Sequence, residues 1–150
     1  MGLREKLKTH ERIMLDTAPI IYFIEEHPDF GPISDEIFQT IRNEHRIYAF
    51  TSIITLIEVL AQPFRTGDED LAETYRRFLC ESSNFTLYDI DGHIAEQAAA
   101  LRGNYEIRTP DAIQLATGIV NEATLFITND KRLKRIKEIE VLSISDYPVQ

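Results

Sequence analysis

The sequence predicts an α/β sandwich built on a parallel sheet. Short runs of β-branched and aromatic residues alternate along the chain with longer segments of helical periodicity. Strands separated by helices indicate parallel crossover units. Acidic residues stand directly after two predicted strands, at positions 16 and 130, where open parallel sheets place their ligand crevice. At 150 residues and 43% hydrophobic composition, residues 1–150 are expected to form one domain.

The first half of the chain begins with a segment, residues 1–12, that is either a frayed helix or a partly disordered lead-in. Hydrophobic periodicity and turn residues then predict, in order, a strand at 12–16, helices at 17–26 and 32–46, a strand at 47–51, and a helix to about 61. Ser34 is a possible cap of the 32–46 helix, and Thr51 or Ser52 caps the last helix. Pro63 is expected to end that helix.

The second half continues the alternation. It predicts a helix at 68–80, a strand at 85–90, a helix from 91 to 103, a helix from 109 to about 120, a strand at 124–128 and a fifth strand near 140–144. Asp91 and Thr109 are the expected caps of their helices, with Pro110 at the first helical position of the second one. Gly103 is expected to stand just past its helix.

Composition limits the class of protein. The formal net charge is −9, which argues against the simplest nucleic-acid binder, although five of the seven residues from Lys131 to Lys137 are basic. One cysteine, Cys80, excludes an internal disulfide framework and a cysteine-based zinc cluster. The first twelve residues lack a signal-peptide core, and no apolar run approaches membrane-spanning length. We therefore expect a cytoplasmic protein with no membrane partner.

Four acids are candidates for a shared site: Asp16, Glu58, Asp111 and Asp130. If the first and fourth strands are neighbours, Asp16 and Asp130 converge, with Asp111 and Glu58 approaching from helices. Crowded carboxylates repel unless a cation neutralises them. An all-oxygen ligand set suits Mg²⁺ or Mn²⁺. Such a site supports the hydrolysis of a phosphodiester.

Each acid alone also has a structural interpretation. Asp16 can cap the following helix, Asp111 can complement a helix dipole, and Asp130 can be a turn residue. Glu58 is flanked by apolar residues. If its carboxylate is buried, it needs a partner, because an unpaired buried charge is costly. The alternative is a solvated face of the helix. The joint placement of all four acids favours the site.

These residues resemble those of the PIN-domain ribonucleases, and among them the VapC-type toxins of prokaryotic toxin–antitoxin pairs. The likeness covers nearly the whole chain and rests on four motifs in order: Leu15-Asp16-Thr17, Thr51-Ser52 with the segment 56–61 around Glu58, Pro110-Asp111-Ala112-Ile113 with Leu115-Ala116, and the segment 126–130. The resemblance implies a PIN-like three-layer α/β/α sandwich whose five parallel strands have the order 3-2-1-4-5.

The resemblance also implies a function. It makes Asp16, Glu58, Asp111 and Asp130 the catalytic and metal-binding acids of an Mg²⁺- or Mn²⁺-dependent endoribonuclease, with Thr128 and Asn129 in support. Cleavage would leave a 3′-hydroxyl and a 5′-phosphate. The implied partners are an RNA substrate, an antitoxin protein and a second copy of the chain.

An RNA strand beside an acidic cleft needs cationic contacts. The first candidates directly follow Asp130 and are Lys131, Arg132, Lys134 and Arg135, with Arg65 as a further candidate. A solvated helix face is the alternative interpretation of these basic residues.

Other functions remain open at this point. A PIN-fold protein-binding module would keep the fold without turnover, and a stand-alone RNA-processing nuclease would act without an antitoxin. A magnesium phosphatase is disfavoured, because Asp16-Thr17-Ala18 lacks the second acid of an Asp-x-Asp motif.

Overall fold

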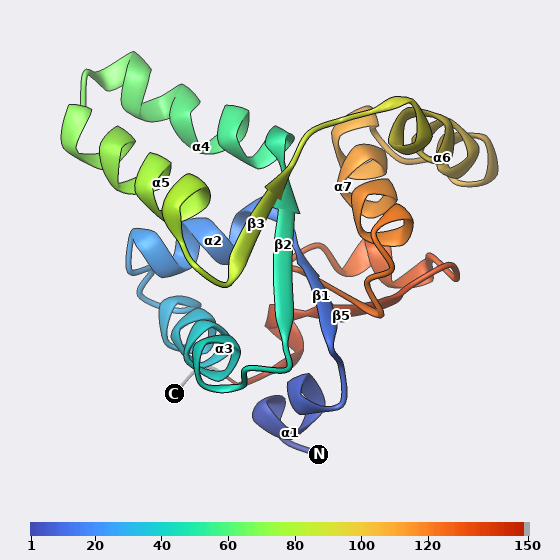
Figure 1. The fold of residues 1–150 in the computed structure, drawn as a ribbon, viewed down its shortest axis with the longest axis horizontal. Helices are drawn as coiled ribbons and strands as arrows, with labels where there is room; N and C mark the ends of the chain where they lie inside the picture. Colours follow the sequence, from blue (N-terminus) through green and yellow to red (C-terminus); the bar gives the residue numbers. More distant parts are fainter. Residues whose placement is uncertain (149–150) are drawn as a thin grey trace.

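A parallel sheet of five strands forms the centre of the computed structural model, which describes residues 1–148 (Figure 1). The strand order β3-β2-β1-β4-β5 confirms the order implied by the resemblance. β1 lies between β2 and β4, with Leu15 of β1 beside Ile127 of β4. The strands are β1 (Arg12–Leu15), β2 (Tyr48–Ser52), β3 (Phe85–Tyr88), β4 (Leu125–Thr128) and β5 (Glu140–Ser143).

Helices cover both faces of this sheet and complete the predicted three layers (Figure 1). On one side lie α2 to α5, and on the other lie α6 and α7. The helices are α1 (Leu3–Lys8), α2 (Thr17–Ile24), α3 (Gly31–Asn43), α4 (Ile53–Thr66), α5 (Glu69–Glu81), α6 (Gly92–Asn104) and α7 (Thr109–Val120), with short 3₁₀ turns η1 (Lys131–Arg135) and η2 (Ile144–Asp146).

Successive side chains of β1 point to opposite faces of the sheet, so β1 contributes to two hydrophobic cores, one on each face. Ile13 and Leu15 pack in the core beneath α2 to α5, whereas Met14 packs with α6 and α7. All three side chains are fully buried. Helices on both faces are the usual environment of a parallel sheet, so its strands are apolar on both sides.

The lead-in at residues 1–12 is a packed helix followed by the start of β1. Leu3 and Leu7 of α1 are buried in the core that also contains Ile37 of α3. Of the two alternatives for this segment, the helix is the one present, because one turn of spacing puts both leucines on the same face.

The prediction that Pro63 ends α4 is wrong. The helix continues to Thr66 and ends at Gly67, whose φ of +72° is the left-handed conformation that glycine adopts readily. Pro63 is buried, and its carbonyl accepts the N–H of Gly67, which closes the final turn. Ser52 is the cap at the other end, where its Oγ accepts the N–H of Ile54 at 3.2 Å.

Other boundaries also shift. α3 begins at Gly31, so Ser34 is buried inside the helix and is not its cap. The turn before it is held by His27, whose Nδ1 accepts the N–H groups of Asp29 and Phe30 at 3.1 Å each, which allows the early start. The same helix ends at Asn43 and not at Arg46.

In α7 and α6 two predicted end residues lie inside the helix. Thr109 is the first residue of α7, and its cap position belongs to Arg108. Pro110 therefore occupies the second position, where its missing N–H costs no helical bond. Gly103 lies within α6, which ends where Tyr105 becomes extended. Asp91 caps α6 as predicted, accepting the N–H of Ile94 at 2.9 Å.

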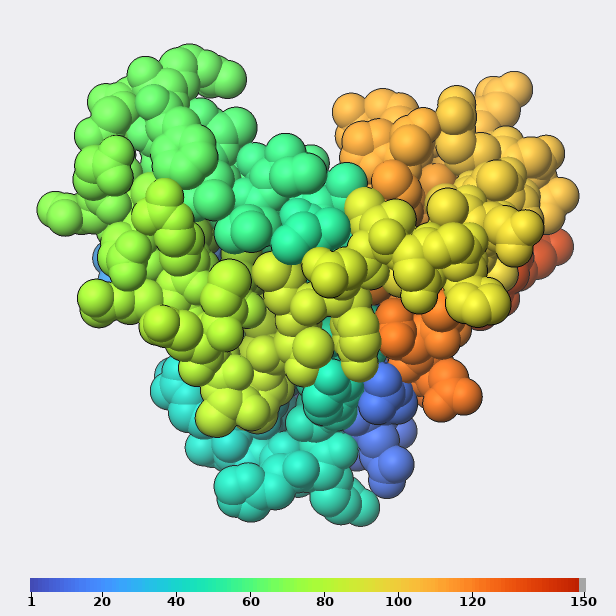
Figure 2. All heavy atoms as spheres, turned by 45° about the horizontal axis from the view of Figure 1, so that its top comes forward, coloured from blue at the N-terminus to red at the C-terminus, as the bar shows by residue number. Residues whose placement is uncertain are grey.

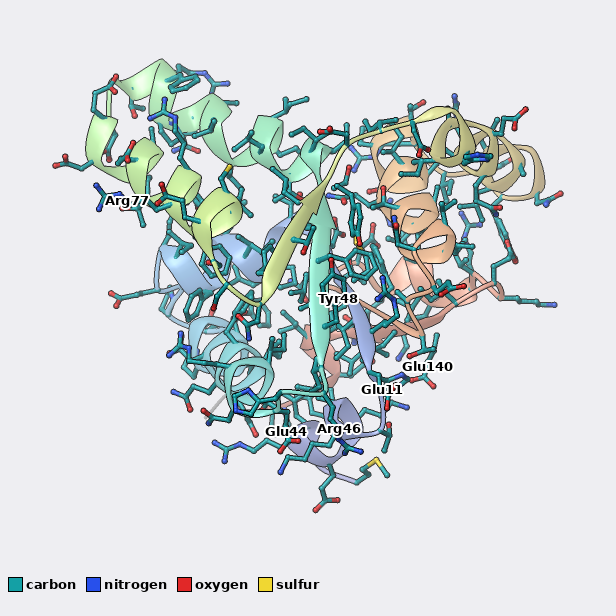
Figure 3. The ribbon with its side chains drawn as sticks, viewed as in Figure 1. Glu11, Glu44, Arg46, Tyr48, Arg77 and Glu140 are labelled. Carbon is teal, nitrogen blue, oxygen red and sulfur yellow. The ribbon has the colours of Figure 1, made fainter. Side chains whose placement is uncertain are left out.

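Ion pairs surround the amino-terminal edge of the sheet, where Figure 3 shows Glu44 and Glu140. Glu140 accepts from Lys6 at 2.6 Å and lies 3.4 Å from His10, and Glu44 lies 3.6 Å from Lys8. The Lys6 ammonium holds the pKa of Glu140 below its usual range, with a smaller effect of His10. Glu44 and Glu140 are thus matched by nearby cations.

Within residues 1–148, every helix is too short or too polar to cross a lipid bilayer.

Candidate active site

Asp16 lies at the opposite, carboxyl-terminal edge of the sheet, between β1 and α2. Its backbone N–H donates to the carbonyl of Ile127 at 2.9 Å, which extends the pairing of β1 with β4. Its Oδ1 accepts the N–H of Thr17 at 2.8 Å, so Asp16 does cap α2. Its Oδ2 remains for a second contact and accepts the hydroxyl of Thr128 at 2.8 Å.

Thr128 joins the segments of two predicted site acids. It is the last residue of β4, and only 1% of it is exposed. Its hydroxyl donates to Asp16 and accepts the backbone N–H of Asp130 at 3.1 Å. The neighbouring first and fourth strands therefore bring Asp16 and the Asp130 backbone to one buried hydroxyl.

The pKa of Asp16 is raised to about 6, chiefly by burial and to a smaller extent by the negative charges of Asp111 and Glu58. The hydrogen bonds from Thr128 and Thr17 act in the opposite direction. A carboxyl whose charged form is disfavoured by two other carboxylates lies in an under-neutralised group of acids. Asp16, Glu58 and Asp111 are thus electrostatically coupled.

Glu58 reaches this group from α4. It is exposed, so of the two alternatives for its apolar surroundings the solvated face is the one present. Its carboxylate is nevertheless held in place, because Oε1 accepts the hydroxyl of Thr17 at 2.7 Å. Thr17 therefore binds two acids, Asp16 through its N–H and Glu58 through its hydroxyl.

Asp111 and Asp130 lie together at one surface pocket, which they line with Arg108 and Arg132. Asp111 stands in the first turn of α7, and Asp130 follows β4. Arg108 donates to Asp111 at 3.4 Å, and Arg132 donates to Asp130 at 3.0 and 2.9 Å. The hydrogen bonds from Arg132 hold the pKa of Asp130 below its usual range.

The contacts of Arg108 and Arg132 occupy carboxylate oxygens that a metal ion would need. Among residues 1–148, no three Asp, Glu, His or Cys side chains are gathered closely enough to hold one ion together. Two of the four predicted ligands face a guanidinium instead. The side chains of Arg108 and Arg132 are 75% and 78% exposed, so both are free to turn into solvent.

The donor set still fits a hard divalent cation. All four acids and Thr128 offer oxygen, which Mg²⁺ and Mn²⁺ prefer. Burial is the main cause of the raised pKa of Asp16, and the smaller contributions of Asp111 and Glu58 add the repulsion that a cation would relieve. The residues that would hold the ion are Asp16, Asp111 and Asp130, with Glu58 beside them.

The basic residues after Asp130 are paired within the chain. Lys131 and Lys134 both pair with Asp146, the first at 3.7 Å. Arg135 donates to the carbonyl of Glu106 at 2.8 Å. Their hydrogen-bonding capacity is thus partly used, although all of them are exposed.

Asn129 and Arg65, two further predicted residues, do not contact the acids. Asn129 donates to the hydroxyl of Tyr22 at 2.8 Å, so its amide is directed to α2. Its Oδ1 is buried and has no hydrogen-bond partner among the described residues. Arg65 is exposed in the last turn of α4.

A buried polar network beneath the acids was missed by the sequence analysis. Gln114 of α7 contacts the hydroxyls of Thr17 and Thr55. The pattern that could have revealed it is a glutamine within the apolar helix 109–120, where a long polar side chain in a buried row needs partners.

Figure 2 shows the surface above this edge, hollowed between α4 in green and α6 and α7 in yellow and orange. The pocket that contains Asp111 and Asp130 belongs to the α7 side. Asp111 and Asp130 are therefore reached from solvent on this side.

Comparison with known proteins supports the architecture. A PIN domain family model matches residues 13–139. Among solved structures, a toxin–antitoxin complex from Klebsiella pneumoniae contains a chain with 24% identity and a TM-score of 0.68, with coverage of 92% of this chain and 99% of that one. No curated protein matches the sequence.

Two further structures show the same fold at lower identity. VapBC2 from Rickettsia felis, bound to a DNA fragment from its promoter, matches at 19% identity and a TM-score of 0.66, covering 88% of this chain and 98% of that one. DNA-bound VapBC from Salmonella typhimurium matches at 18% identity and a TM-score of 0.69, covering 89% and 98%. These likenesses extend over nearly the whole of each matched chain.

Proposed function

Because the chain belongs to the PIN domain family, we propose that it is a metal-dependent endoribonuclease, acting in the cytoplasm as the toxin of a VapBC-type toxin–antitoxin pair. The observation that carries the proposal is that Thr17 and Thr128 join Asp16 to Glu58 and to the Asp130 backbone at the carboxyl-terminal edge of the sheet. Carboxylates gathered in this way repel one another, and a bound cation would neutralise them. The toxin assignment draws on the solved toxin–antitoxin complexes with the same fold.

In this proposal Asp16, Asp111 and Asp130 hold Mg²⁺ or Mn²⁺, with Glu58 beside them. When bound, the ion supplies Lewis-acid activation of water and neutralisation of phosphate charge. The protein supplies orientation. Thr128 fixes Asp16, and Thr17 fixes Glu58. Water adds to phosphorus and the bond to the 3′-oxygen breaks, which leaves a 3′-hydroxyl and a 5′-phosphate.

We propose that the RNA backbone lies along η1, where Lys131, Arg132, Lys134 and Arg135 are exposed beside Asp130. Phosphate contacts of this kind bring affinity without base specificity. Because these residues have partners within the chain, RNA must displace Asp146 from the lysines and Asp130 from Arg132. Arg65 is a further candidate for a phosphate contact.

Two protein partners belong to the proposal. A homodimer is supported by Ile57 and Phe64, which are 63% and 55% exposed and stand two turns apart on α4. We propose that the antitoxin docks at an aromatic pocket between α2, α3 and α5, which is lined by Phe23, Phe38 and Phe78. A reading frame for a small DNA-binding protein next to the gene would favour the toxin over a stand-alone RNA-processing nuclease.

The decisive experiment is cleavage of a mixed RNA pool by wild type and by Asp111→Asn, with Mn²⁺, Mg²⁺ or EDTA. We expect metal-dependent cleavage by wild type and loss of at least about 100-fold in the variant, since a site carboxylate is removed. Asp35→Asn, on the exposed side of α3, is the matched control and should cleave normally. Circular dichroism should show that both variants are folded.

Calorimetric titration of Mn²⁺ distinguishes a nuclease from a protein-binding module. Wild type that binds no Mn²⁺ and cleaves no RNA would overturn the nuclease proposal and leave the binding module. Wild type that binds Mn²⁺ but cleaves nothing in the pool would indicate a narrow RNA target.

A further inference from the structure

A buried polar network connects three helices directly beneath the acidic site. Gln114 of α7 is 1% exposed, and its Nε2 donates to the hydroxyl of Thr17 on α2 at 3.1 Å and to that of Thr55 on α4 at 2.9 Å. Thr17 and Thr55 are themselves buried. One amide group thus ties together the helices that carry or adjoin Asp16, Glu58 and Asp111.

The two hydrogen bonds from Gln114 are received by the threonine oxygens, which leaves the proton of each hydroxyl for another partner. A threonine hydroxyl has one proton to donate. The Thr17 oxygen accepts from Gln114, and its proton is donated to Oε1 of Glu58 at 2.7 Å. The Thr55 oxygen accepts likewise, and its proton is available to Thr51 at 2.7 Å.

The series of hydrogen bonds through Thr51 ends at the carbonyl of Leu15, which can only accept. Thr51 donates to the carbonyl of Leu15 at 2.7 Å, so its own proton is used and its oxygen must accept from Thr55. Each hydroxyl of the network then has one proton direction, and only the N–H side of the Gln114 amide is compatible with those directions at Thr17 and Thr55. With the amide reversed, its oxygen would compete with Glu58 for the proton of Thr17.

The orientation of the Gln114 amide is unfavourable for the stability of the fold, because it leaves one buried oxygen unpaired within the described part of the chain. Oε1 of Gln114 is buried without a hydrogen-bond partner in residues 1–148. Unpaired buried oxygens are unfavourable, and an apolar side chain of the same length would avoid this one. What the glutamine contributes is therefore its pair of N–H donors.

We propose that Gln114 is a positioning residue for the acidic site. It turns the Thr17 hydroxyl toward Glu58 and so holds Glu58 next to Asp16, which the N–H of Thr17 binds. The inference rests on the proposed metal-dependent nuclease function and adds a residue that contacts neither metal nor RNA. Outer partners of this kind commonly tune metal affinity and activity.

The test compares Gln114→Met, which keeps length and removes both donors, with Thr17→Val and with the double variant. Mn²⁺ dissociation constants are measured by calorimetry without RNA, and kcat and KM with RNA. We expect Gln114→Met to weaken Mn²⁺ binding and lower kcat by about 10-fold each, with KM nearly unchanged. If Gln114 acts through Thr17, the double variant should be no worse than Thr17→Val alone.

Two further variants separate positioning from packing. Thr117→Val removes a buried hydroxyl from the same helix, where it donates only to the carbonyl of Ile113 at 2.7 Å, and should leave Mn²⁺ binding unchanged. Thr17→Ser keeps the hydroxyl and should retain wild-type binding. If Gln114→Met fails to fold, the Thr17→Val and Thr17→Ser pair makes the comparison at the other end of the same bond.

The outcomes are distinguishable. Wild type that binds Mn²⁺ and cleaves RNA, with Gln114→Met equal to it in both, would overturn the positioning role alone. So would fully additive losses in the double variant, or equal losses in Thr17→Ser and Thr17→Val. Wild type that neither binds Mn²⁺ nor cleaves would overturn the proposed function, and the positioning role would fall with it.

Discussion

Arg132 donates two hydrogen bonds to the carboxylate of Asp130, from Nε at 3.0 Å and from Nη2 at 2.9 Å. The two residues are only two positions apart, at the point where β4 leads into η1. The guanidinium occupies the oxygens that a cation would use, and Arg108 makes one longer contact with Asp111 at 3.4 Å. Two of the four acids of the site are thus paired with arginines.

Replacing Arg132 by alanine should therefore tighten the binding of Mn²⁺. The cation then no longer displaces a guanidinium from Asp130, and one repelling positive charge is gone. Because the pair is exposed, we expect a modest effect, about two- to fivefold in the dissociation constant. Calorimetry at low ionic strength measures it.

Lys131→Ala is the control for this comparison, because Lys131 pairs with Asp146 and not with Asp130. It should change Mn²⁺ affinity less than Arg132→Ala does. Weaker Mn²⁺ binding by Arg132→Ala would mean that the guanidinium organises Asp130 for the ion instead of competing with it.

Asp16→Asn should stabilise the metal-free protein increasingly as the pH rises. The pKa of Asp16 is about 6 in the folded protein, against 3.8 in an unfolded chain. Protonation of Asp16 therefore favours folding, and that contribution is complete below pH 4 and lost as the pH rises through 6. The loss amounts to at most about 3 kcal/mol for wild type, and asparagine avoids it while remaining a good helix cap.

Denaturant unfolding in EDTA at pH 5 and pH 7.5 checks this. The difference in unfolding free energy between variant and wild type should grow in favour of the variant at the higher pH. Excess Mn²⁺ at pH 7.5 should reverse the order, because only the wild-type carboxylate binds the ion well. An equal difference at both pH values would show that the Asp16 carboxyl is not perturbed.

The features that sequence predicted well are those set by local pattern and chain direction. Asp16 and Asp130 follow apolar strand segments, so a parallel sheet places both at one edge, and the capping role of Asp91 follows from its own side chain. The strand order came from the resemblance to the PIN-domain family. Local pattern alone left open which strands are neighbours.

The features that sequence missed depend on side chains meeting from distant segments. Gln114 and Thr17 are 97 positions apart, and nothing near either residue indicates the contact. The guanidinium contacts of Asp111 and Asp130 were missed for another reason. Arg108 and Arg132 are close in sequence, but whether they bind acid or RNA depends on rotamers. Pro63 was misjudged because its burial, a tertiary effect, outweighs its helix-breaking tendency.

Asp146→Asn should strengthen RNA binding. Lys131 and Lys134 both pair with this carboxylate, and Lys134 lowers the pKa of Asp146 below its usual range. Without the negative charge, the two ammonium groups are available to phosphates. We expect an affinity gain of a few fold for single-stranded RNA at low salt, measured in EDTA to prevent cleavage.

The salt dependence of binding checks the mechanism of that gain. Each additional phosphate contact should steepen the slope of log affinity against log salt by about 0.7 for a single strand. Glu81→Gln, at the exposed end of α5, removes one charge at another place and is the control for net charge. Equal gains from both variants would attribute the effect to net charge and remove the role proposed for η1.

Gly118→Ala should destabilise the fold, whereas Gly103→Ala should not. A Cβ at Gly118 would lie 3.1 Å from Cβ and 3.2 Å from Cγ of the fully buried Met14, so α7 would be pushed from the sheet. Overpacking of this kind costs about 1–3 kcal/mol, against a gain in helix propensity of about 1 kcal/mol. A Cβ at Gly103 meets nothing within 4 Å, so only the gain remains.

Thermal unfolding should place the melting temperature of Gly118→Ala below that of wild type and that of Gly103→Ala at or above it. Equal behaviour of the two variants would mean that α7 and β1 are less closely packed, and the acid at the start of α7 less firmly placed beside Asp16.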